Sequence, residues 1–119
     1  MNILVAEDND VNQLLIKKML EKMGFNVDIV ENGQKAVDAV LGNHYDIVFM
    51  DIQMPVLNGI EASEKIMKEM KSPPPIVAVT ANVFEEDKNR CLKAGMKDHI
   101  GKPFRAEDLQ NAIKKYVQQ

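Results

Sequence analysis

Three short hydrophobic runs without polar interruption stand out in the chain, at residues 3–6, 47–50 and 76–79. Continuous runs of this length, rich in Ile and Val, are typical of strands that are buried on both faces of a parallel sheet. Residues 25–30, in which hydrophobic positions alternate, form a fourth candidate strand, and residues 99–100 form a shorter fifth. We therefore expect five strands.

The segments between these runs carry apolar residues at spacings of three and four, which predicts helices. The first helix begins at Asn9 or Asp10, either of which can act as its N-cap, and it is closed by Gly24. The apolar positions that recur at helical spacing within it are Val11, Leu14, Leu15, Met19 and Met23.

Four further helices are predicted over residues 33–41, 58–70, 83–94 and 106–117; Asn58 caps one of them and Gly95 ends another. The residues expected to face inward are Ala36, Val37, Val40, Ile60, Ser63, Met67, Met70, Leu109, Ala112, Ile113, Tyr116 and Val117. A strand followed by a helix, five times over, predicts an α/β fold, a doubly wound (βα)5 three-layer sandwich with right-handed crossovers. Because we find no linker, residues 1–119 are expected to form one domain.

Composition narrows the classes of function. The 119 residues are 45% hydrophobic and 28% charged, which are ordinary values for a globular domain. No apolar run approaches the ~20 residues needed to cross a bilayer, and the N-terminus lacks the features of a signal peptide. The single Cys91 and the net charge of −3 fit a cytoplasmic protein with no membrane contact and no direct binding to nucleic acid.

Polar residues follow four of the predicted strands. Glu7 and Asp8 come after the first, Asp51 after the third, Thr80 after the fourth and Lys102 after the fifth. Ligands of open parallel sheets bind beyond the carboxyl ends of the strands. We therefore expect these five side chains to converge on one crevice.

Three clustered carboxylates need a counter-charge, because two charges ~4 Å apart repel by roughly 4 kcal/mol at an effective dielectric of 20. A Mg²⁺ ion, or Mn²⁺ in its place, is the natural complement for oxygen ligands, with Glu7 and Asp8 placed to hold it. Lys102 and the Thr80 hydroxyl would then neutralise the oxygens of a phosphoryl group, and Asp51 on the central strand is the best nucleophile.

With these residues in place, the chain resembles the receiver domain of two-component response regulators. The motifs that carry the resemblance are ILVAEDN at residues 3–9, MDIQMP at 50–55, NG at 58–59, VTAN at 79–82 and GKPF at 101–104. The resemblance covers the whole chain. It implies a flavodoxin-like sheet with the strand order 2-1-3-4-5.

The resemblance also implies a role for each acidic residue. Asp51 matches the aspartate that accepts a phosphoryl group from a phosphohistidine of a histidine kinase or a histidine phosphotransfer protein. Asp8 and the main-chain carbonyl of Gln53 match direct Mg²⁺ ligands, together with Asp51, and Glu7 acts through water. The side chain of Gln53 falls where family members tune the lifetime of the acyl phosphate.

Other matched positions surround the phosphoryl group. Thr80 and Lys102 match the residues that hold its oxygens, Ala81 is small where the family needs open access, and Asn82 is a second lifetime position. The peptide bond before Pro103 matches one that is usually cis.

One position departs from the family. Tyr or Phe usually stands three residues before the lysine, and this chain has His99 there. The imidazole would swing inward as Thr80 moves, and a pKa near ~6.5 would add a pH dependence to the switch. The face expected to change on phosphorylation comprises the helix at 83–94, the strand at 99–100 and the helix at 106–117. A dimer formed on phosphorylation is left open.

The residues of these motifs are most similar to those of receivers of hybrid sensor histidine kinases. The alternative is a stand-alone single-domain regulator, since we expect no output domain within these residues. The expected chemistry is self-phosphorylation and self-dephosphorylation, without metabolic turnover. A haloacid-dehalogenase-type phosphatase would use Asp8 and Asp10, but Asn12 departs from its pattern and the chain leaves little room for a substrate cap. A nucleotide- or flavin-binding module lacks its glycine-rich loop, and a non-phosphorylated pseudo-receiver is disfavoured by the intact set of five residues.

Overall fold

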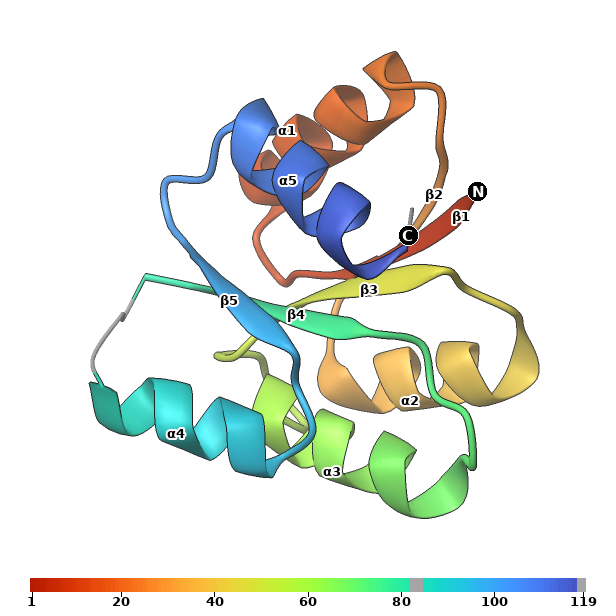
Figure 1. Cartoon of the computed structure of the whole chain (residues 1–119), viewed down its shortest axis with the longest axis vertical. Helices are drawn as coiled ribbons and strands as arrows, with labels where there is room; N and C mark the ends of the chain where they lie inside the picture. The colour runs from red at the N-terminus through yellow and green to blue at the C-terminus, as the bar shows by residue number, and fades with distance from the viewer. Residues whose placement is uncertain (82–84, 118–119) are drawn as a thin grey trace.

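The structure, a computed structural model, describes residues 1–81 and 85–117, and its strands and helices alternate along the chain (Figure 1). The elements are β1 (Asn2–Ala6), α1 (Asp10–Lys22), β2 (Asn26–Val30), α2 (Gly33–Gly42), β3 (Ile47–Asp51), α3 (Gly59–Glu69), β4 (Ile76–Thr80), α4 (Glu85–Lys93), β5 (Asp98–Gly101) and α5 (Ala106–Tyr116).

The five strands form one parallel sheet with the order β2-β1-β3-β4-β5. Val5 of β1 pairs with Ile29 of β2 on one side and with Phe49 of β3 on the other. Because every pair is parallel, the carboxyl ends of all the strands meet at one edge of the sheet. The expected flavodoxin-like fold and strand order are confirmed.

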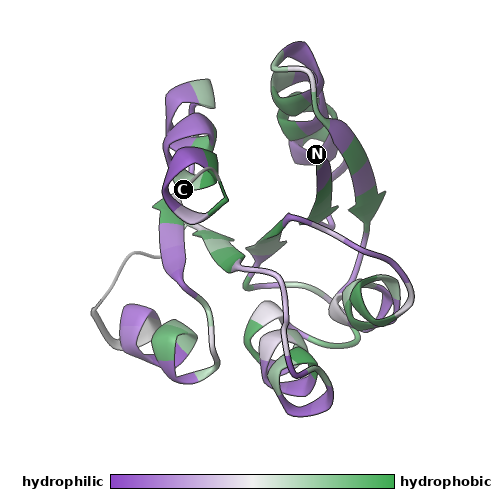
Figure 2. Ribbon diagram, turned by 45° about the vertical axis from the view of Figure 1, so that its right-hand side comes forward, coloured by the Kyte–Doolittle hydropathy of each residue, from purple (hydrophilic) through white to green (hydrophobic). Residues whose placement is uncertain are grey.

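Helices cover both faces of the sheet, with α1 and α5 on one face and α2, α3 and α4 on the other (Figures 1 and 2). Alternating residues of each strand supply the two cores. From β1, Ile3 and Val5 pack in the core beneath α1 and α5, whereas Leu4 and Ala6 pack in the core above α2 and α3. Strands buried on both faces account for the uninterrupted hydrophobic runs in the sequence.

Asparagine side chains start three of the helices. Asn9, Asn32 and Asn58 each accept a hydrogen bond from the backbone N–H three residues further on, at the N-termini of α1, α2 and α3. Asn58 and Glu61 form a reciprocal capping box. The predicted caps at Asn9 and Asn58 are confirmed, so the starts of α1 and α3 are encoded locally.

The apolar stripe that identifies α1 in the sequence is not the face that α1 buries. Val11, Leu14 and Leu15 are 73%, 57% and 45% exposed. The helix packs against the sheet through Ile16 and Leu20 instead. Apolar residues occupy most of the circumference of α1, and the position of the helix over the sheet decides which of them are covered.

The other helices match their predicted faces more closely. In α2 the three residues expected to face inward are buried, and in α5 Leu109, Ala112 and Ile113 are buried. In α3 the core also includes Ala62 and Ile66, which the prediction omitted. The expected helix at 83–94 is observed as α4 from residue 85; residues 83 and 84 lie outside the described part. No described helix combines the length and hydrophobicity that crossing a membrane requires.

Candidate functional site

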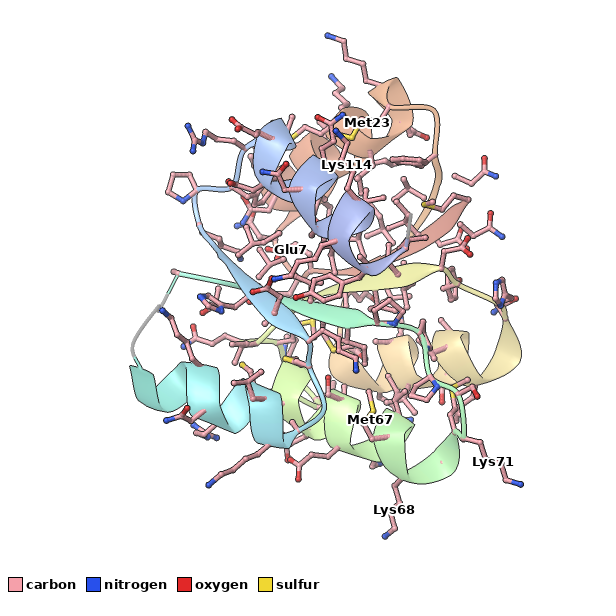
Figure 3. All side chains as sticks on the ribbon, in the orientation of Figure 1. Glu7, Met23, Met67, Lys68, Lys71 and Lys114 are labelled. Atoms are coloured by element: carbon pink, nitrogen blue, oxygen red, sulfur yellow. The ribbon has the colours of Figure 1, made fainter. Side chains whose placement is uncertain are left out.

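The carboxyl edge of the sheet brings the predicted polar residues together. Glu7, labelled in Figure 3, directly follows β1, Asp51 and Thr80 are the last residues of β3 and β4, and Lys102 directly follows β5. The backbone N–H of Lys102 donates to the carbonyl of Thr80 at 2.8 Å, which ties the ends of β4 and β5 together. Parallel pairing therefore produces the convergence that the sequence indicated.

Lys102 bridges two buried carboxylates. Its Nζ donates to Asp51 Oδ2 at 2.9 Å and to Glu7 Oε2 and Oε1 at 3.1 and 3.3 Å. Asp51 is only 5% exposed, and Glu7 is also buried. Charge-assisted hydrogen bonds of this length fix the ammonium between the two acids.

The two acids are held from other directions as well. Asn12, in the first turn of α1, donates from Nδ2 to Glu7 Oε1 at 3.1 Å, and Gln13 donates to the Glu7 carbonyl. The backbone N–H of Gln53 donates to Asp51 Oδ1 at 3.2 Å. Neither Asn12 nor Gln13 was predicted to belong to the site. Their place in the first turn of a helix that follows β1 was the available signal.

Charge in this cluster is unbalanced. Burial, together with the neighbouring Glu7, raises the pKa of Asp51 to about 6, although Lys102 opposes the rise. For Glu7, burial also raises the pKa, but hydrogen bonding with Asp51, Asn12 and Lys102 outweighs burial, so its pKa is lowered. Burial lowers the pKa of Lys102, but the two carboxylates outweigh burial and raise it. As the pH falls, Asp51 therefore binds a proton before Glu7 does, because one ammonium does not neutralise both acids.

Asp8 adds a third carboxylate, which is exposed. One oxygen from each of Glu7, Asp8 and Asp51 lies within 4.8 Å of the others. An all-oxygen cluster with surplus negative charge is the donor set that Mg²⁺ prefers, with the remaining coordination positions left to water and phosphate oxygens. These residues fit a magnesium ion.

An open pocket of about 630 Å³ lies beside this cluster, lined by Asp8, Ile52, Gln53, Met54, Pro55, Asn58, Ile60, Thr80 and Arg90. The loop between β3 and α3 forms part of its wall. Gly59 begins α3 so close to Asp51 that a Cβ there would lie 2.2 Å from the Asp51 carbonyl oxygen. In the same loop the exposed Val56 has φ 69°, an uncommon conformation for a β-branched residue, which is the kind of local strain that concentrates at functional sites.

The remaining predicted residues take different positions. Ala81 is exposed directly after β4, and the peptide bond between Lys102 and Pro103 is cis. Asn82 lies outside the described residues. His99 is half-buried on β5, where its Nδ1 is 3.8 Å from Asp98 Oδ1. It lines a separate groove of about 490 Å³ between β5 and α5, away from the pocket beside Asp51.

Comparison with known proteins decides the family. Residues 3–114 match the family described as "Response regulator receiver domain". The chain belongs to this family of receiver domains. It is a phosphoacceptor receiver domain whose acidic cluster comprises Glu7, Asp8 and Asp51.

Similar receivers occur within larger proteins. The chain is 42% identical over 121 residues to hybrid signal transduction histidine kinase L of Dictyostelium discoideum, and 37% identical over 118 residues to the aerobic respiration control sensor protein ArcB of Escherichia coli. These alignments include 96% and 98% of this chain but only 7% and 15% of the relatives. The shared region is thus one module of those proteins.

Two solved structures give the same fold. The receiver domain of sensor histidine kinase PA1611 from Pseudomonas aeruginosa PAO1 has a TM-score of 0.91 at 39% identity, covering 99% of this chain and 98% of that one. That receiver was crystallised with a magnesium ion coordinated in its active-site cleft. The receiver domain of Saccharomyces cerevisiae Ssk1, co-crystallised with the histidine phosphotransfer protein Ypd1, has a TM-score of 0.90 at 32% identity, covering 99% and 89% of the two chains.

Proposed function

We propose that Asp51 accepts a phosphoryl group from a phosphohistidine in a Mg²⁺-dependent reaction, and that residues 1–119 form a single receiver domain acting as a phosphorylation switch. The observation that carries the proposal is the position of the Asp51 carboxyl, 2.9 Å from the Lys102 ammonium and grouped with Glu7 and Asp8. An open pocket adjoins this group, which gives a phosphodonor access from solvent.

Each residue has a defined part in the transfer. A carboxylate oxygen of Asp51 attacks phosphorus, the bond from phosphorus to the donor nitrogen breaks, and its electron pair stays on the departing imidazole. The Lys102 ammonium, now paired with Asp51, stabilises a phosphoryl oxygen, and the Thr80 hydroxyl stabilises another. Asp8, Asp51 and the Gln53 carbonyl would hold Mg²⁺ directly and Glu7 would hold it through water, and the ion would neutralise charge on the phosphoryl group.

The switch follows from the new charge. An acyl phosphate would carry about two negative charges where the Asp51 carboxylate carried one, and it would place them beside Lys102 and Thr80. Thr80 is paired with Gly101 in the β4–β5 ladder, and His99 on β5 pairs with Ala78. A shift of Thr80 toward the phosphoryl group therefore biases the α4–β5–α5 face between two arrangements, with His99 as the side chain that reports the change.

The partner is a protein that presents a phosphohistidine. The exposed Val11, Leu14 and Leu15 form an apolar surface on α1, whose first turn also holds Glu7 through Asn12. This surface suits a partner helix that places its phosphohistidine over the pocket, and the co-crystal of a receiver with a histidine phosphotransfer protein supports such a partner. The similarity to ArcB and to the Dictyostelium kinase favours an origin in a hybrid histidine kinase over a stand-alone regulator.

The site consists of one acceptor carboxylate, Asp51, beside an open pocket. The domain therefore catalyses its own phosphorylation and dephosphorylation and does not convert a metabolite. We place the reaction in the cytoplasm. The buried thiol of Cys91, the only cysteine of the chain, agrees with a reducing compartment.

Intact mass spectrometry after incubation with acetyl phosphate tests the proposal. Wild-type protein gains one phosphoryl mass in the presence of Mg²⁺ and none with a chelator, and peptide mapping places the hydroxylamine-labile adduct on Asp51. Asp51→Asn removes the adduct, whereas Asp98→Asn, which changes a carboxylate outside the site, retains it. A stoichiometric adduct on Asp51→Asn would move the acceptor elsewhere.

A further inference from the structure

α4 contributes a cation to the pocket beside Asp51. Among the described residues that line the pocket, Asp8 and Arg90 are the charged ones, and Arg90 is the member that comes from α4. The Arg90 side chain is exposed. Within the described part of the chain no ion pair or hydrogen bond engages its guanidinium. The pocket therefore presents an exposed guanidinium that has no ion pair with any of the described side chains.

Lys102 is paired with two carboxylates at the sheet edge, whereas Arg90 is exposed on α4. Lys102 Nζ contacts two buried carboxylates within 3.3 Å, so its charge is used at the floor of the site. Arg90 lines the pocket together with Asp8, Thr80 and residues of the β3–α3 loop. A guanidinium offers several N–H donors in a planar fork, which suits carboxylate and phosphate oxygens.

In-line phosphoryl transfer to Asp51 gives the Arg90 guanidinium a chemical role. When Asp51 attacks phosphorus from the floor of the site, the leaving group departs in the opposite direction, toward the mouth of the pocket. An acyl phosphate forms the new Asp51 oxygen–phosphorus bond while its own phosphorus–oxygen bond breaks, and the electron pair leaves with the carboxylate. Negative charge therefore develops on the side of the phosphoryl group that faces the pocket, which Arg90 helps to line.

We propose that Arg90 determines donor specificity: its guanidinium contacts the outward-facing oxygens of a small acyl phosphate and favours donors with an anionic leaving group. Phosphoramidate gains less from this contact, because its nitrogen is already protonated near neutral pH and leaves as neutral ammonia when the phosphorus–nitrogen bond breaks. The assignment rests on the proposed function, since it needs Asp51 as the acceptor.

The test compares two phosphodonors across matched variants. Second-order rate constants for adduct formation, at saturating Mg²⁺, are measured by intact mass with acetyl phosphate and with phosphoramidate for wild type, Arg90→Ala, Arg90→Lys and Lys93→Ala. Arg90→Ala lowers the acetyl phosphate constant about three- to tenfold, the range expected for loss of one hydrogen bond of ordinary net strength at an exposed side chain, and changes the phosphoramidate constant less than about twofold. Arg90→Lys is intermediate. Lys93→Ala, which removes a cation from the same helix outside the pocket, matches wild type.

The ratio of the two constants separates a contact with the leaving group from a general effect. An equal loss with both donors shows that Arg90 acts through the fold or through overall charge, and it overturns the assignment. Unchanged constants in Arg90→Ala overturn it as well. If wild type forms no Asp51 adduct with either donor but accepts the phosphoryl group from a phosphohistidine, this assignment fails while the proposed function stands; if it accepts from neither source, both fail.

Discussion

Two aspartates of this receiver have similar neighbours, but their pKa values shift in opposite directions. Asp51 lies beside Lys102 and a backbone N–H donor, and Asp98 lies beside Lys115, the Tyr116 hydroxyl and the backbone N–H of His99. Burial and the nearby Glu7 raise the pKa of Asp51 to about 6. Burial also acts to raise the pKa of Asp98, but hydrogen bonds from His99 and Tyr116 and the charge of Lys115 outweigh burial and lower it.

The difference comes from a second carboxylate and from hydration. Asp51 is 5% exposed and shares its cation with Glu7, whereas the Asp98 side chain is 34% exposed and faces donors without a competing acid. The Asp98 network is satisfied within the protein. The Asp51 network is left with surplus negative charge, which a divalent cation and a phosphoryl group held by Lys102 can use. Perturbed acids of this kind concentrate at functional sites.

The largest effect on stability is expected from Lys102→Ala. This change leaves two buried carboxylates without their ammonium, so the free energy of unfolding falls by about 2–3 kcal/mol in metal-free buffer, below the ~3–5 kcal/mol of a fully buried pair because Lys102 keeps some water contact. Urea unfolding measures the loss, and Mg²⁺ should restore part of it. Lys115→Ala, at an exposed ion pair, is the matched control and changes stability far less. Equal losses in the two variants would contradict the comparison.

Removing the Asp51 charge should stabilise the metal-free protein. Its pKa in the folded state is about 6, above its value in an unfolded chain, so the folded protein binds a proton more tightly. The stabilisation from that proton is present below about pH 4 and is lost as the pH rises through about 6. Asp51→Asn avoids this loss and raises the free energy of unfolding by about 1–2 kcal/mol at pH 8, discounted for residual hydration of the carboxyl.

Urea titrations from pH 4 to 8 measure this effect. The gap between Asp51→Asn and wild type grows with pH, and Mg²⁺ reduces it because only wild type carries all three carboxylates. If Asp51→Asn is less stable than wild type at pH 8 without metal, the contacts of the folded protein stabilise the ionised Asp51 carboxylate, and this prediction is wrong.

Removing the charge of Asp98 should lower the stability of the protein, the opposite of the effect expected at Asp51. Asp98→Asn removes a carboxylate that accepts from Tyr116 and His99, so the free energy of unfolding falls by about 1 kcal/mol at neutral pH. Because the pKa of Asp98 is lowered in the folded protein, its contribution is present above the unfolded pKa and is lost as the pH falls through the folded value. The loss in Asp98→Asn therefore shrinks on acidification, and Mg²⁺ leaves it unchanged. A loss that depends on Mg²⁺ would link Asp98 to the metal site.

The smallest effect is expected at a neutral buried group. The Ser63 Oγ is fully buried in α3 and makes no hydrogen bond among the described residues. Ser63→Ala removes the desolvated hydroxyl, so the free energy of unfolding stays the same or rises by up to about 1 kcal/mol, independently of pH and Mg²⁺. Thermal unfolding measures the change. A clear destabilisation would mean that Ser63 has a polar partner.

The sequence predicted the sheet and the convergence of the site because both depend on strand order and strand ends. Uninterrupted hydrophobic runs located the strands, and parallel pairing carried Asp51, Thr80 and Lys102 to one edge. It could not tell which apolar face of α1 is covered, because Leu14 and Ile16 are equally hydrophobic and only the docked helix separates them.

Some of the candidate site was outside the reach of sequence patterns. Arg90 follows Asp51 by 39 positions and comes from the exposed side of α4, so only the packing of α4 against the sheet places it at the pocket. The pKa of Asp51 depends likewise on how closely Glu7 approaches in three dimensions. Strand ends predict which residues meet, and packing decides how their charges interact.

Transfer from a phosphohistidine tests the central claim most directly. A histidine phosphotransfer protein carrying radiolabelled phosphohistidine is mixed with wild type, Asp51→Asn or Asp98→Asn in the presence of Mg²⁺, and the label is followed by gel. We expect label on wild type and Asp98→Asn, labile to hydroxylamine and blocked by a chelator, and none on Asp51→Asn. Stable label on Asp51→Asn, or label on wild type that forms equally without a divalent ion, would contradict Asp51 as the magnesium-dependent phosphoryl acceptor.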